Sequence, residues 1–497
     1  MKTKLLAGLI GACFAAPVLA QSSITIYGIA DAGVHITNNG EGTRARLVSG
    51  IAEGSRLGFR GVEDIGNGFK AIFNLEARVE LDTGSNTTGN LGSNENFIFT
   101  RGLTFAPVFT AATLPTVRAA VSAGVSAQAT AAAIAAGQTP AAAAAIGAAS
   151  AAAYIASPTG IADVNARTAA AIAAPAAGLL AGTRLGLRTA AAGSLVNPNR
   201  SIFDRTASVG LITPVGAIIL GRQYTPAYEV LAASDTFEVG TAGSWGSVAF
   251  GTGGFITTGI AIRSDQSVQY RIVHPSGFSL ALMYGFKNSG YLGLDKRFYS
   301  GHIKYKANGF DLGIGYANGQ DQVGNAGLIS SVAGGSYEVD SFKFFAGYLN
   351  MRNTNSVVVP LILAQVWDAA IAPTLAAQPV ALRTALRGAF EANLRQNFQL
   401  NADSYTGGLQ YKLGSGKLMA SVSYTNDKLA TDSDPTQYAI GYDHYLSKRT
   451  DIYIVGSYID NSKLGQYAAG AASAPGGYTL NPGGKSRTFQ IGMRHKF

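Results

Sequence analysis

Apolar residues take every second position between residues 70 and 81, and polar residues fill most positions between them. The apolar set is Ala71, Phe73, Leu75, Ala77, Val79 and Leu81, and the polar set is Lys70, Asn74, Glu76, Arg78 and Glu80. A period of two places the two sets on opposite faces of a β-strand. The preceding residues alternate in the same way, and Glu63–Gly68 between them contains Gly and Asn, which tolerate tight turns. Residues 54–81 are therefore predicted to form a hairpin with one apolar and one charged face.

The same alternation recurs almost to the last residue, and the connections between the alternating segments alternate in length. Short turns are expected at 63–68, 213–216, 275–277, 308–309, 339–341, 414–417 and 447–450. Long connections are expected near 38–52, 82–200, 225–262, 288–296, 319–327, 353–401, 427–435 and 461–485. Short turns at one end and long loops at the other are typical of outer-membrane barrels, and closure leaves no strand edge unpaired in lipid. The pattern predicts an all-β fold, a 16-stranded antiparallel transmembrane β-barrel formed by residues 21–497.

Two Ala-rich insertions interrupt this pattern, at 107–200 in the second long connection and at 353–401 in the sixth. Alanine favours helix, whereas Gly and Pro break the first insertion into pieces, so it is predicted to be partly helical. In the second insertion, Leu382, Leu386, Phe390 and Leu394 recur four residues apart and predict an amphipathic helix. This helix either packs on a loop or binds a partner.

The N-terminus has the pattern of a secretory signal peptide covering residues 1–20. Met1–Lys4 is basic, Leu5–Ala16 is apolar, and Val18–Ala20 offers small residues for cleavage before Gln21. The single cysteine, Cys13, lies inside this segment, and a lipoprotein cleavage site there is the alternative interpretation. A mature chain without cysteine has no disulfide bonds.

Composition narrows the possible partners and cofactors. The formal net charge of +9 loses two units with Lys2 and Lys4, and the remaining basic residues are scattered singly, so nucleic-acid binding is not expected. No metal-ligand spacing or phosphate-binding loop is present, so neither a metal nor another cofactor is predicted. The charge-free stretch 119–162 is long enough for a membrane-spanning helix, but it consists mostly of alanine and is interrupted by Gln and Pro.

Several motifs resemble those of Gram-negative general-diffusion porins of the β-proteobacterial type. The resemblance covers the mature chain except the two insertions. It rests on residues 24–31, 55–71, 203–205, 209–211, 220–226, 446–450 and 492–497. It implies an outer-membrane homotrimer of sixteen-stranded barrels, each a water-filled channel for passive diffusion of ions and small polar solutes. It also implies that loop 3, here about 226–262, folds into the pore.

The resemblance carries particular residues to the narrowest part of that pore. It implies a basic wall formed by Arg56, Arg205 and Arg263, with Glu76 as an acidic wall residue and Asp235 and Glu238 on loop 3. Residues 99–103 are a second, poorer match to the fourth strand, and if they form it, Arg101 replaces Arg205.

Charged side chains at a constriction attract ions of opposite sign, and the net positive charge suggests a weak preference for anions. The alternative for each arginine is a solvated or salt-bridged wall residue that does not control permeation. Phe497 resembles the terminal aromatic residue recognised by the barrel-assembly machinery, and the alternative is simply a last strand that faces membrane lipid.

Two other functional classes differ from a porin in what they require of the chain. An enzyme needs a nucleophile and a base close together, and none of the five histidines lies in a pattern that suggests a triad, so the chain is not expected to be an enzyme. A surface adhesin or structural barrel would use the large inserted loops to bind partners. Deletion of 107–200 would separate these classes, because an adhesin would lose binding and a porin would keep or raise its conductance.

Overall fold

The computed structural model describes residues 23–88, 101–191, 197, 200–250, 259–286, 297–320, 324–353, 358–474 and 476–497. The predicted signal peptide lies outside these residues. The chain divides into two compact units. The barrel unit comprises Met1–Ser93, Ser194–Asn355 and Leu400–Phe497, and the helical unit comprises Asn94–Gly193 and Ser356–Gln399. Each unit is described by itself.

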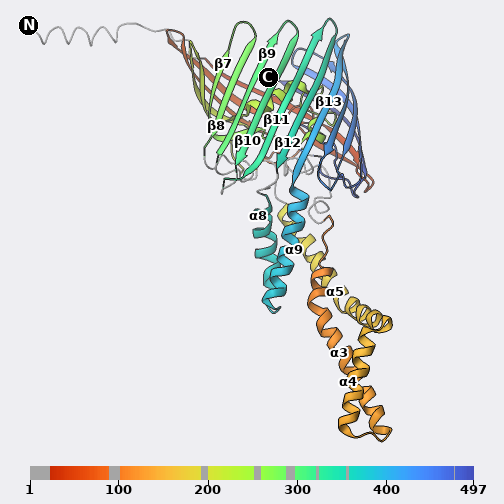
Figure 1. Ribbon diagram of the computed structural model, residues 1–497. Helices are drawn as coiled ribbons and strands as arrows, with labels where there is room; N and C mark the ends of the chain where they lie inside the picture. The colour runs from red at the N-terminus through yellow and green to blue at the C-terminus, as the bar shows by residue number, and fades with distance from the viewer. Residues whose placement is uncertain are drawn as a thin grey trace, which may run out of the picture. The chain divides into compact units, whose positions relative to one another are not determined.

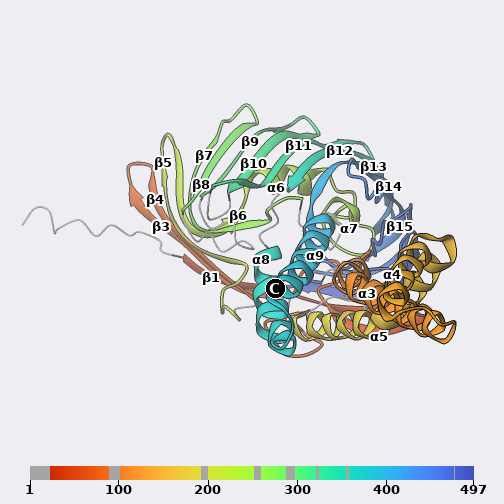
Figure 2. The ribbon, with the colours of Figure 1, turned by 60° about the horizontal axis from the view of Figure 1, so that its bottom comes forward.

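The barrel unit is one closed antiparallel sheet, because the last strand, β17, pairs with the first, β1 (Figures 1 and 2). Its strands are β1 (Ser23–Asn38), β2 (Thr43–Ser49), β3 (Arg56–Gly66), β4 (Phe69–Arg78), β5 (Thr206–Thr213), β6 (Gly216–Tyr224), β7 (Arg263–Val273), β8 (Phe278–Gly285), β9 (Arg297–Ala307), β10 (Phe310–Gln320), β11 (Ala326–Val339), β12 (Phe342–Asn353), β13 (Leu400–Leu413), β14 (Gly416–Asp427), β15 (Pro435–Tyr445), β16 (Thr450–Asn461) and β17 (Lys485–Lys496).

Two of the 17 strands share one position in the wall, so the barrel has the sixteen strand positions that the sequence predicts. The second half of β1 pairs with β2, and its first half pairs with β3 on the same side. The interruption at residues 50–55 therefore divides one long strand into two. The prediction of a loop over 38–52 was wrong in part, because β2 lies within it.

The predicted hairpin is confirmed as β3 and β4, with Gly58 opposite Glu76 and Phe59 opposite Leu75. Its turn contains three residues with positive φ, Gly66, Asn67 and Gly68, as its Gly and Asn content predicts. Around the barrel, apolar side chains on outward positions are exposed, such as Ile440 at 64%, whereas polar side chains on inward positions are buried, such as Gln490 at 0%. This arrangement suits a wall whose outer face contacts lipid.

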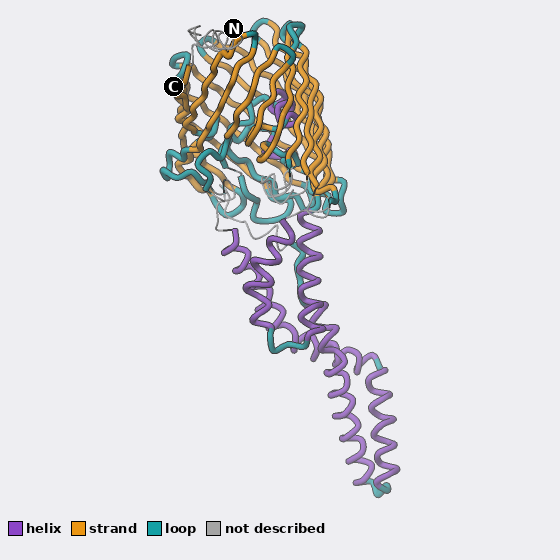
Figure 3. Tube along the Cα trace, turned by 90° about the vertical axis from the view of Figure 1, so that its left-hand side faces the viewer, coloured by secondary structure: helices purple, strands orange, loops and turns teal. Residues whose placement is uncertain are grey.

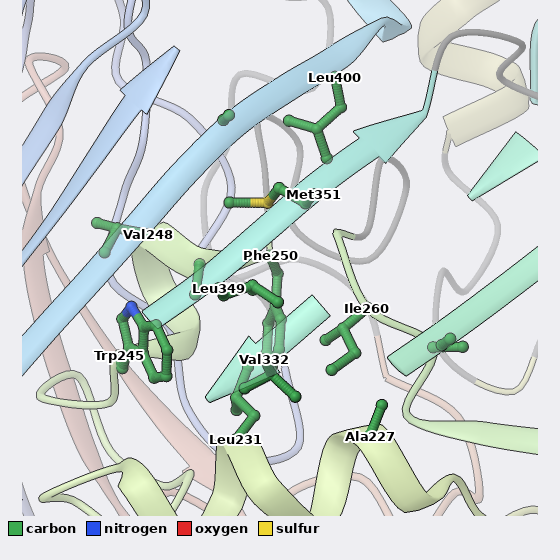
Figure 4. Packing of buried hydrophobic residues seen from close by; sticks show 14 of the residues in the cluster. Ala227, Leu231, Trp245, Val248, Phe250, Ile260, Val332, Leu349, Met351 and Leu400 are labelled. Atoms are coloured by element: carbon green, nitrogen blue, oxygen red, sulfur yellow. The ribbon is translucent and has the colours of Figure 1, made fainter. Parts of the chain in front are cut away.

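The segment between β6 and β7 contains two short helices, α6 (Pro226–Ser234) and α7 (Gly246–Ala249). The Thr225 side chain accepts a hydrogen bond from the Tyr228 N–H and caps α6, whose first residue is a proline. Trp245, Leu231 and Phe250 of this segment pack with Val332, Leu349, Met351 and Leu400 of the strands (Figure 4).

Hydrogen bonds also attach the same segment to side chains of the wall. The Trp245 Nε1–H donates to Ser404 Oγ at 2.9 Å, and the amides of Gln410 and Gln437 donate to the carbonyl oxygens of Thr236 and Ala242, each at 2.7 Å. The partners on the strands are buried. The segment is therefore fixed by apolar packing and by hydrogen bonds together.

The helical unit consists of α3 (Ala106–Ala135), α4 (Pro140–Ala156), α5 (Pro158–Ala191), α8 (Val358–Ile362), the π-helix η2 (Leu363–Ile371), the 3₁₀-helix η3 (Ala372–Leu375) and α9 (Val380–Phe398). Figure 3 distinguishes these helices from the strands of the barrel unit by colour. The charge-free stretch 119–162 is not one helix, because it is divided among α3, α4 and α5. Gly137, at φ 81°, and the Thr139 cap of α4 separate the first two.

The predicted amphipathic helix is α9, and its apolar positions are buried within the helical unit. Leu386, Phe390 and Leu394 are fully buried, and the Phe390 ring lies 5.6 Å from that of Trp367 in η2. This helix therefore packs on its own insertion. By length and composition, Ala106–Ala135 and Pro158–Leu187 are apolar enough to cross a membrane, although most of each is exposed.

Candidate functional site

Glu76 in β4 joins two of the three predicted arginines. The Arg205 Nε–H donates to Glu76 Oε1 at 2.6 Å, and Arg56 Nη1 lies 3.6 Å from Glu76 Oε2. The Arg205 main-chain N–H also donates to the Glu76 carbonyl oxygen at 3.2 Å, which fixes Arg205 immediately before β5. Arg205 and Glu76 are both buried, at 5% and 6% exposure. Two cations therefore share one carboxylate.

Tyr224 at the end of β6 joins the third arginine to this pair. The Arg205 and Arg263 Nη2 groups donate to its hydroxyl oxygen, at 3.1 and 2.5 Å respectively. The Arg263 guanidinium carbon also lies 4.2 Å from the centre of the Tyr224 ring, a cation–π contact. Arg263 is opposite Tyr224 in the β6–β7 register. Arg56, Arg205, Glu76, Tyr224 and Arg263 are here called the arginine cluster.

The arginine cluster carries more positive than negative charge. Arg56 has a second acidic partner, because its Nη2 group donates to Glu53 Oε1 at 3.2 Å. Arg263 has no ion pair within the part of the chain that the structure describes, and its buried Nε has no hydrogen-bond partner there. Burial raises the pKa of the Glu53 carboxyl, but Arg56, Lys496 and Arg494 outweigh burial and hold that pKa below its usual value.

The interruption between β2 and β3 positions Arg56, and it depends on Asp31, which sequence reasoning missed. The Asp31 carboxylate accepts hydrogen bonds from the main-chain N–H groups of Ile51, Ala52 and Glu53, at 3.2, 3.0 and 2.7 Å, and from the Tyr453 hydroxyl at 2.6 Å. Asp31 lies on the polar face of the opening strand, and this alternation could have placed it in the lumen of the barrel. Its backbone partners, 20 to 22 residues away, left no sequence pattern.

The two acids predicted on loop 3 make their hydrogen bonds and ion pairs, among the described residues, with groups outside the arginine cluster. The Asp235 carboxylate accepts hydrogen bonds from the Phe237 N–H at 2.9 Å, the Ser244 hydroxyl at 2.6 Å and the Trp245 N–H at 3.1 Å. Burial raises its pKa to about 6, although these hydrogen bonds oppose that shift. Asp235 thus ties its own segment together.

Glu238 forms an ion pair with Lys417 of β14 and accepts a hydrogen bond from Gln410. Burial raises its pKa, but Lys417 outweighs burial and lowers it below its usual value. Among the described residues, neither Asp235 nor Glu238 has an ion pair or a hydrogen bond with Arg56, Arg205 or Arg263.

Arg101, the alternative to Arg205, belongs to the helical unit. Its Nε–H donates to Asn397 Oδ1 at 3.0 Å, and its carbonyl oxygen accepts from the Asn393 and Asn397 amides. Residues 206–213, which follow Arg205, form the strand that pairs with β4. Arg205 therefore lies where the better sequence match expects it.

Phe497 closes the wall next to β1. Its N–H donates to the Gly28 carbonyl oxygen at 3.1 Å, and its own oxygen accepts from the Gly28 N–H at 3.0 Å. A Cβ atom on Gly28 would lie 2.3 Å from Phe497 Cζ, so the ring lies over a position that a side chain would obstruct. Its role as an assembly signal stays a prediction.

The described residues contain no group of three or more His, Cys, Asp or Glu that could hold a metal ion.

Comparison with known protein families identifies the class of protein to which the chain belongs. A family model described as Gram-negative porin matches residues 6–464. The chain belongs to this family. It is accordingly a Gram-negative outer-membrane β-barrel protein of the porin class, which is not a class of enzymes.

Two curated proteins are similar to one part of this porin. The major outer membrane protein P.IB of Neisseria meningitidis is 36% identical over 94 residues, which are 18% of this chain and 28% of that protein. An outer membrane porin protein of Bordetella pertussis is 34% identical over 100 residues, 17% of this chain and 26% of that protein. The matched part thus covers only about a quarter of the length of each of these two relatives.

Two solved structures share the fold of the porin over nearly its whole length. An anion-selective porin from Comamonas acidovorans has a TM-score of 0.58 and 19% identity, and the match covers 96% of this chain and all of that one. OmpT of Vibrio cholerae has a TM-score of 0.50 and 12% identity, covering 97% of this chain and all of that one. At these identities the similarity concerns the fold alone.

Proposed function

We propose that this porin is a water-filled channel for passive diffusion of ions and small hydrophilic solutes, with a weak preference for anions. The observation that carries the proposal is the arginine cluster, in which Arg56, Arg205 and Arg263 converge and Arg263 has no carboxylate partner among the described residues. Fixed positive charge at a constriction lowers the energy of a passing anion and raises that of a cation. The similar barrel from Comamonas acidovorans is that of an anion-selective porin, which agrees with this sign.

The constriction is proposed to form between the arginine cluster and the segment 225–262. The hydrogen bonds from Gln410 and Gln437 to the main chain of that segment support this proposal, because both glutamines are buried while the adjacent Leu409 and Tyr438 are exposed. Asp235 and Glu238 then belong to the segment that narrows the pore. Their effect on ions is through their charge and not through contact with the arginines.

The porin is further proposed to work as a homotrimer in outer-membrane lipid, inserted by the barrel-assembly machinery through Phe497. Exposed apolar side chains on outward positions, such as Ile26 and Ile491, suit contact with lipid or with a second barrel. Chemical crosslinking in native membranes tests the trimer, and insertion of a Phe497→Ala variant tests the signal.

Planar-bilayer recording tests the channel and its selectivity. Purified protein should give discrete conductance steps, and its reversal potential in a KCl gradient should have the sign of an anion-preferring pore. Arg56→Ala, Arg205→Ala and Arg263→Ala should each move that potential toward cation preference. Arg167→Ala is the matched control, because this exposed arginine in the helical unit forms an ion pair with Asp163 and is not part of the arginine cluster. Absence of steps would contradict the channel, and unchanged potentials in all three variants would remove the arginines from the filter.

A surface adhesin or structural barrel is the second candidate, and the size of the helical unit favours it. Exposed apolar residues on α3, α4 and α5, such as Ile134, Ile146 and Ile161, leave a surface that a partner would cover. Deletion of 107–200 separates the two functions. Binding to a surface or to cells that disappears with the deletion supports the adhesin, whereas unchanged or higher conductance supports a porin.

A further inference from the structure

Tyr224 is the one uncharged member of the arginine cluster, and both Arg205 and Arg263 depend on its hydroxyl oxygen. We propose that Tyr224 is the positioning residue of the anion filter, because it holds these two guanidinium groups side by side where one small carboxylate can meet both. The proposal rests on the proposed function and deepens it by naming the residue that organises the filter and the class of anion that it favours.

The first argument concerns the repulsion between two neighbouring cations. Like charges at short distance repel, and among the described residues Glu76 forms ion pairs with Arg205 and Arg56 but not with Arg263. Arg263 has no acidic partner in the described residues, so its position depends on uncharged groups. Tyr224 supplies two of them, a hydroxyl oxygen that accepts a hydrogen bond and a ring face that attracts the cation.

The second argument concerns the rigidity of Tyr224 itself. Its ring stacks on that of Tyr228, with centroids 5.6 Å apart and an angle of 9° between the planes. Tyr228 belongs to α6, and the adjacent Thr225 N–H donates to the Ile262 carbonyl oxygen at 3.0 Å, which joins the two ends of the segment 225–262. Because Tyr224 and its partner Arg263 flank these ends, the tyrosine is fixed by the base of that segment.

The third argument concerns the solute. The two Nη2 atoms bonded to Tyr224 lie no further apart than the sum of 3.1 and 2.5 Å. A carboxylate has two oxygens that accept hydrogen bonds from separate guanidinium groups, and such charge-assisted contacts are stronger than neutral ones. Chloride has only one centre and gains less from paired donors. The cluster therefore favours small carboxylates over chloride.

The test compares Tyr224→Phe with Tyr228→Phe in the full-length protein in planar bilayers. Each change removes one hydroxyl from one of two stacked rings, but only the Tyr224 hydroxyl bonds to arginines among the described residues. Reversal potentials are measured in gradients of potassium acetate and of KCl. We expect Tyr224→Phe to lower the acetate-to-chloride permeability ratio by about threefold. This change corresponds to less free energy than one hydrogen bond to a charged group contributes. Tyr228→Phe should leave it unchanged.

A second readout separates positioning from a general structural change. In about 1 M salt the Debye length falls to about 3 Å, so the pore conductance there reports the width of the channel more than its charge. Tyr224→Phe should keep the conductance of the unaltered protein under this condition. A loss of conductance equal to the loss of selectivity would overturn the positioning role, because it would mean that the constriction itself had changed shape.

Arg263→Gln distinguishes failure of this proposal from failure of the filter. If Arg263→Gln lowers anion permeability and Tyr224→Phe changes nothing, the filter stands and the role of Tyr224 is overturned. If Arg263→Gln also changes nothing, the proposed filter itself fails. Equal effects of Tyr224→Phe and Tyr228→Phe would also overturn the role. If Tyr224→Phe does not fold, Tyr224→His is measured, because its ring nitrogen still accepts a hydrogen bond; a preserved ratio supports the proposal and a lost one overturns it.

Discussion

Arg494 and the arginine cluster, both in the barrel wall, differ in the number of carboxylates that each arginine contacts. Arg494 of β17 donates to Asp451 at 3.1 Å, to Glu53 at 3.2 Å and to Asp443 at 3.4 Å, so three acids surround one cation. In the arginine cluster the ratio is reversed, because Glu76 and Glu53 face Arg56 and Arg205, and Arg263 has no ion pair among the described residues.

Under the proposed function, the difference separates charges that hold the wall from charges that act on solutes. A buried cation with several acidic partners is neutralised and presents little field to the pore, whereas an excess of cations presents a field that acts on passing ions. Glu53 belongs to both groups, since it contacts Arg494 and Arg56. On this proposal, the same residue types serve either stability or permeation, depending on their partners.

The largest expected effect concerns stability at Arg494. Arg494→Ala leaves Asp443 and Asp451 buried without their shared cation, and removal of one partner from a buried ion pair costs about 3–5 kcal/mol. Unfolding by denaturant in detergent micelles, followed by circular dichroism, measures this loss. Selectivity should change little if the variant is folded.

Adding Asp443→Asn and Asp451→Asn to Arg494→Ala is the control for this prediction. The two amides remove the unpaired charges, so most of the lost stability should return. If Arg205→Ala destabilises the protein as much as Arg494→Ala, the contrast between the two groups is wrong.

A pH effect extends the comparison to Asp235, a buried carboxylate held by hydrogen bonds and by no ion pair among the described residues. Its folded-state pKa of about 6 lies above the ordinary value of 3.8, so the folded state binds the proton more tightly than the unfolded state. The contribution of Asp235 to stability is therefore fully present below about pH 4 and is lost as the pH rises to about 6. The loss is on the order of 3 kcal/mol.

Limited proteolysis of the segment 225–262 at pH 4 and pH 7, with a protease active at both, measures this effect. The segment should open more readily at pH 7, and Asp235→Asn should remove most of the difference because the amide does not ionise. An unchanged pH difference in the variant would assign it to titratable groups other than Asp235. Glu238 is not such a group, because its lowered pKa makes its contribution fall as the pH falls.

The smallest effect concerns selectivity at Glu76. Glu76→Gln removes the negative charge of the arginine cluster but keeps an oxygen for Arg205, so the preference for anions should rise by about twofold. Reversal potentials in a KCl gradient measure it. Glu338→Gln is the matched control, because this exposed carboxylate pairs with Lys412 near a short turn. A fall in anion preference would mean that Glu76 mainly holds the arginines in place.

The alternating strands and the arginines predicted for the basic wall were reached from the sequence on different grounds. Period-two alternation is local, so Phe73 and Glu76 reveal their faces without knowledge of the fold. The positions of Arg56, Arg205 and Arg263 came from the resemblance to porins, because nothing local brings these distant residues together. The helix over 380–398 was also predictable, since Leu386, Phe390 and Leu394 repeat with its period.

The remaining features depend on contacts between distant residues. The division between β2 and β3 requires Asp31 to bind the main chain of residues 51–53. The link from Arg205 to Arg263 requires the β6–β7 register, which places Tyr224 beside both. Asp235 was predicted at the constriction, and its hydrogen bonds to its own segment could not be read from the sequence. The alternation of apolar and polar residues along a strand carries no information on such contacts between distant residues.

The helical insertion between β4 and β5 has a consequence for how the barrel forms. These adjacent strands end at Arg78 and begin at Thr206, so their pairing must wait for a long stretch of chain. The entropy of loop closure grows only with the logarithm of length, about 0.6 kcal/mol for each doubling, so this loop costs about 2 kcal/mol more than one of ten residues. Helices α3, α4 and α5 form by local contacts and can fold before that pairing. The wall therefore tolerates a large insertion between two adjacent strands at small thermodynamic cost.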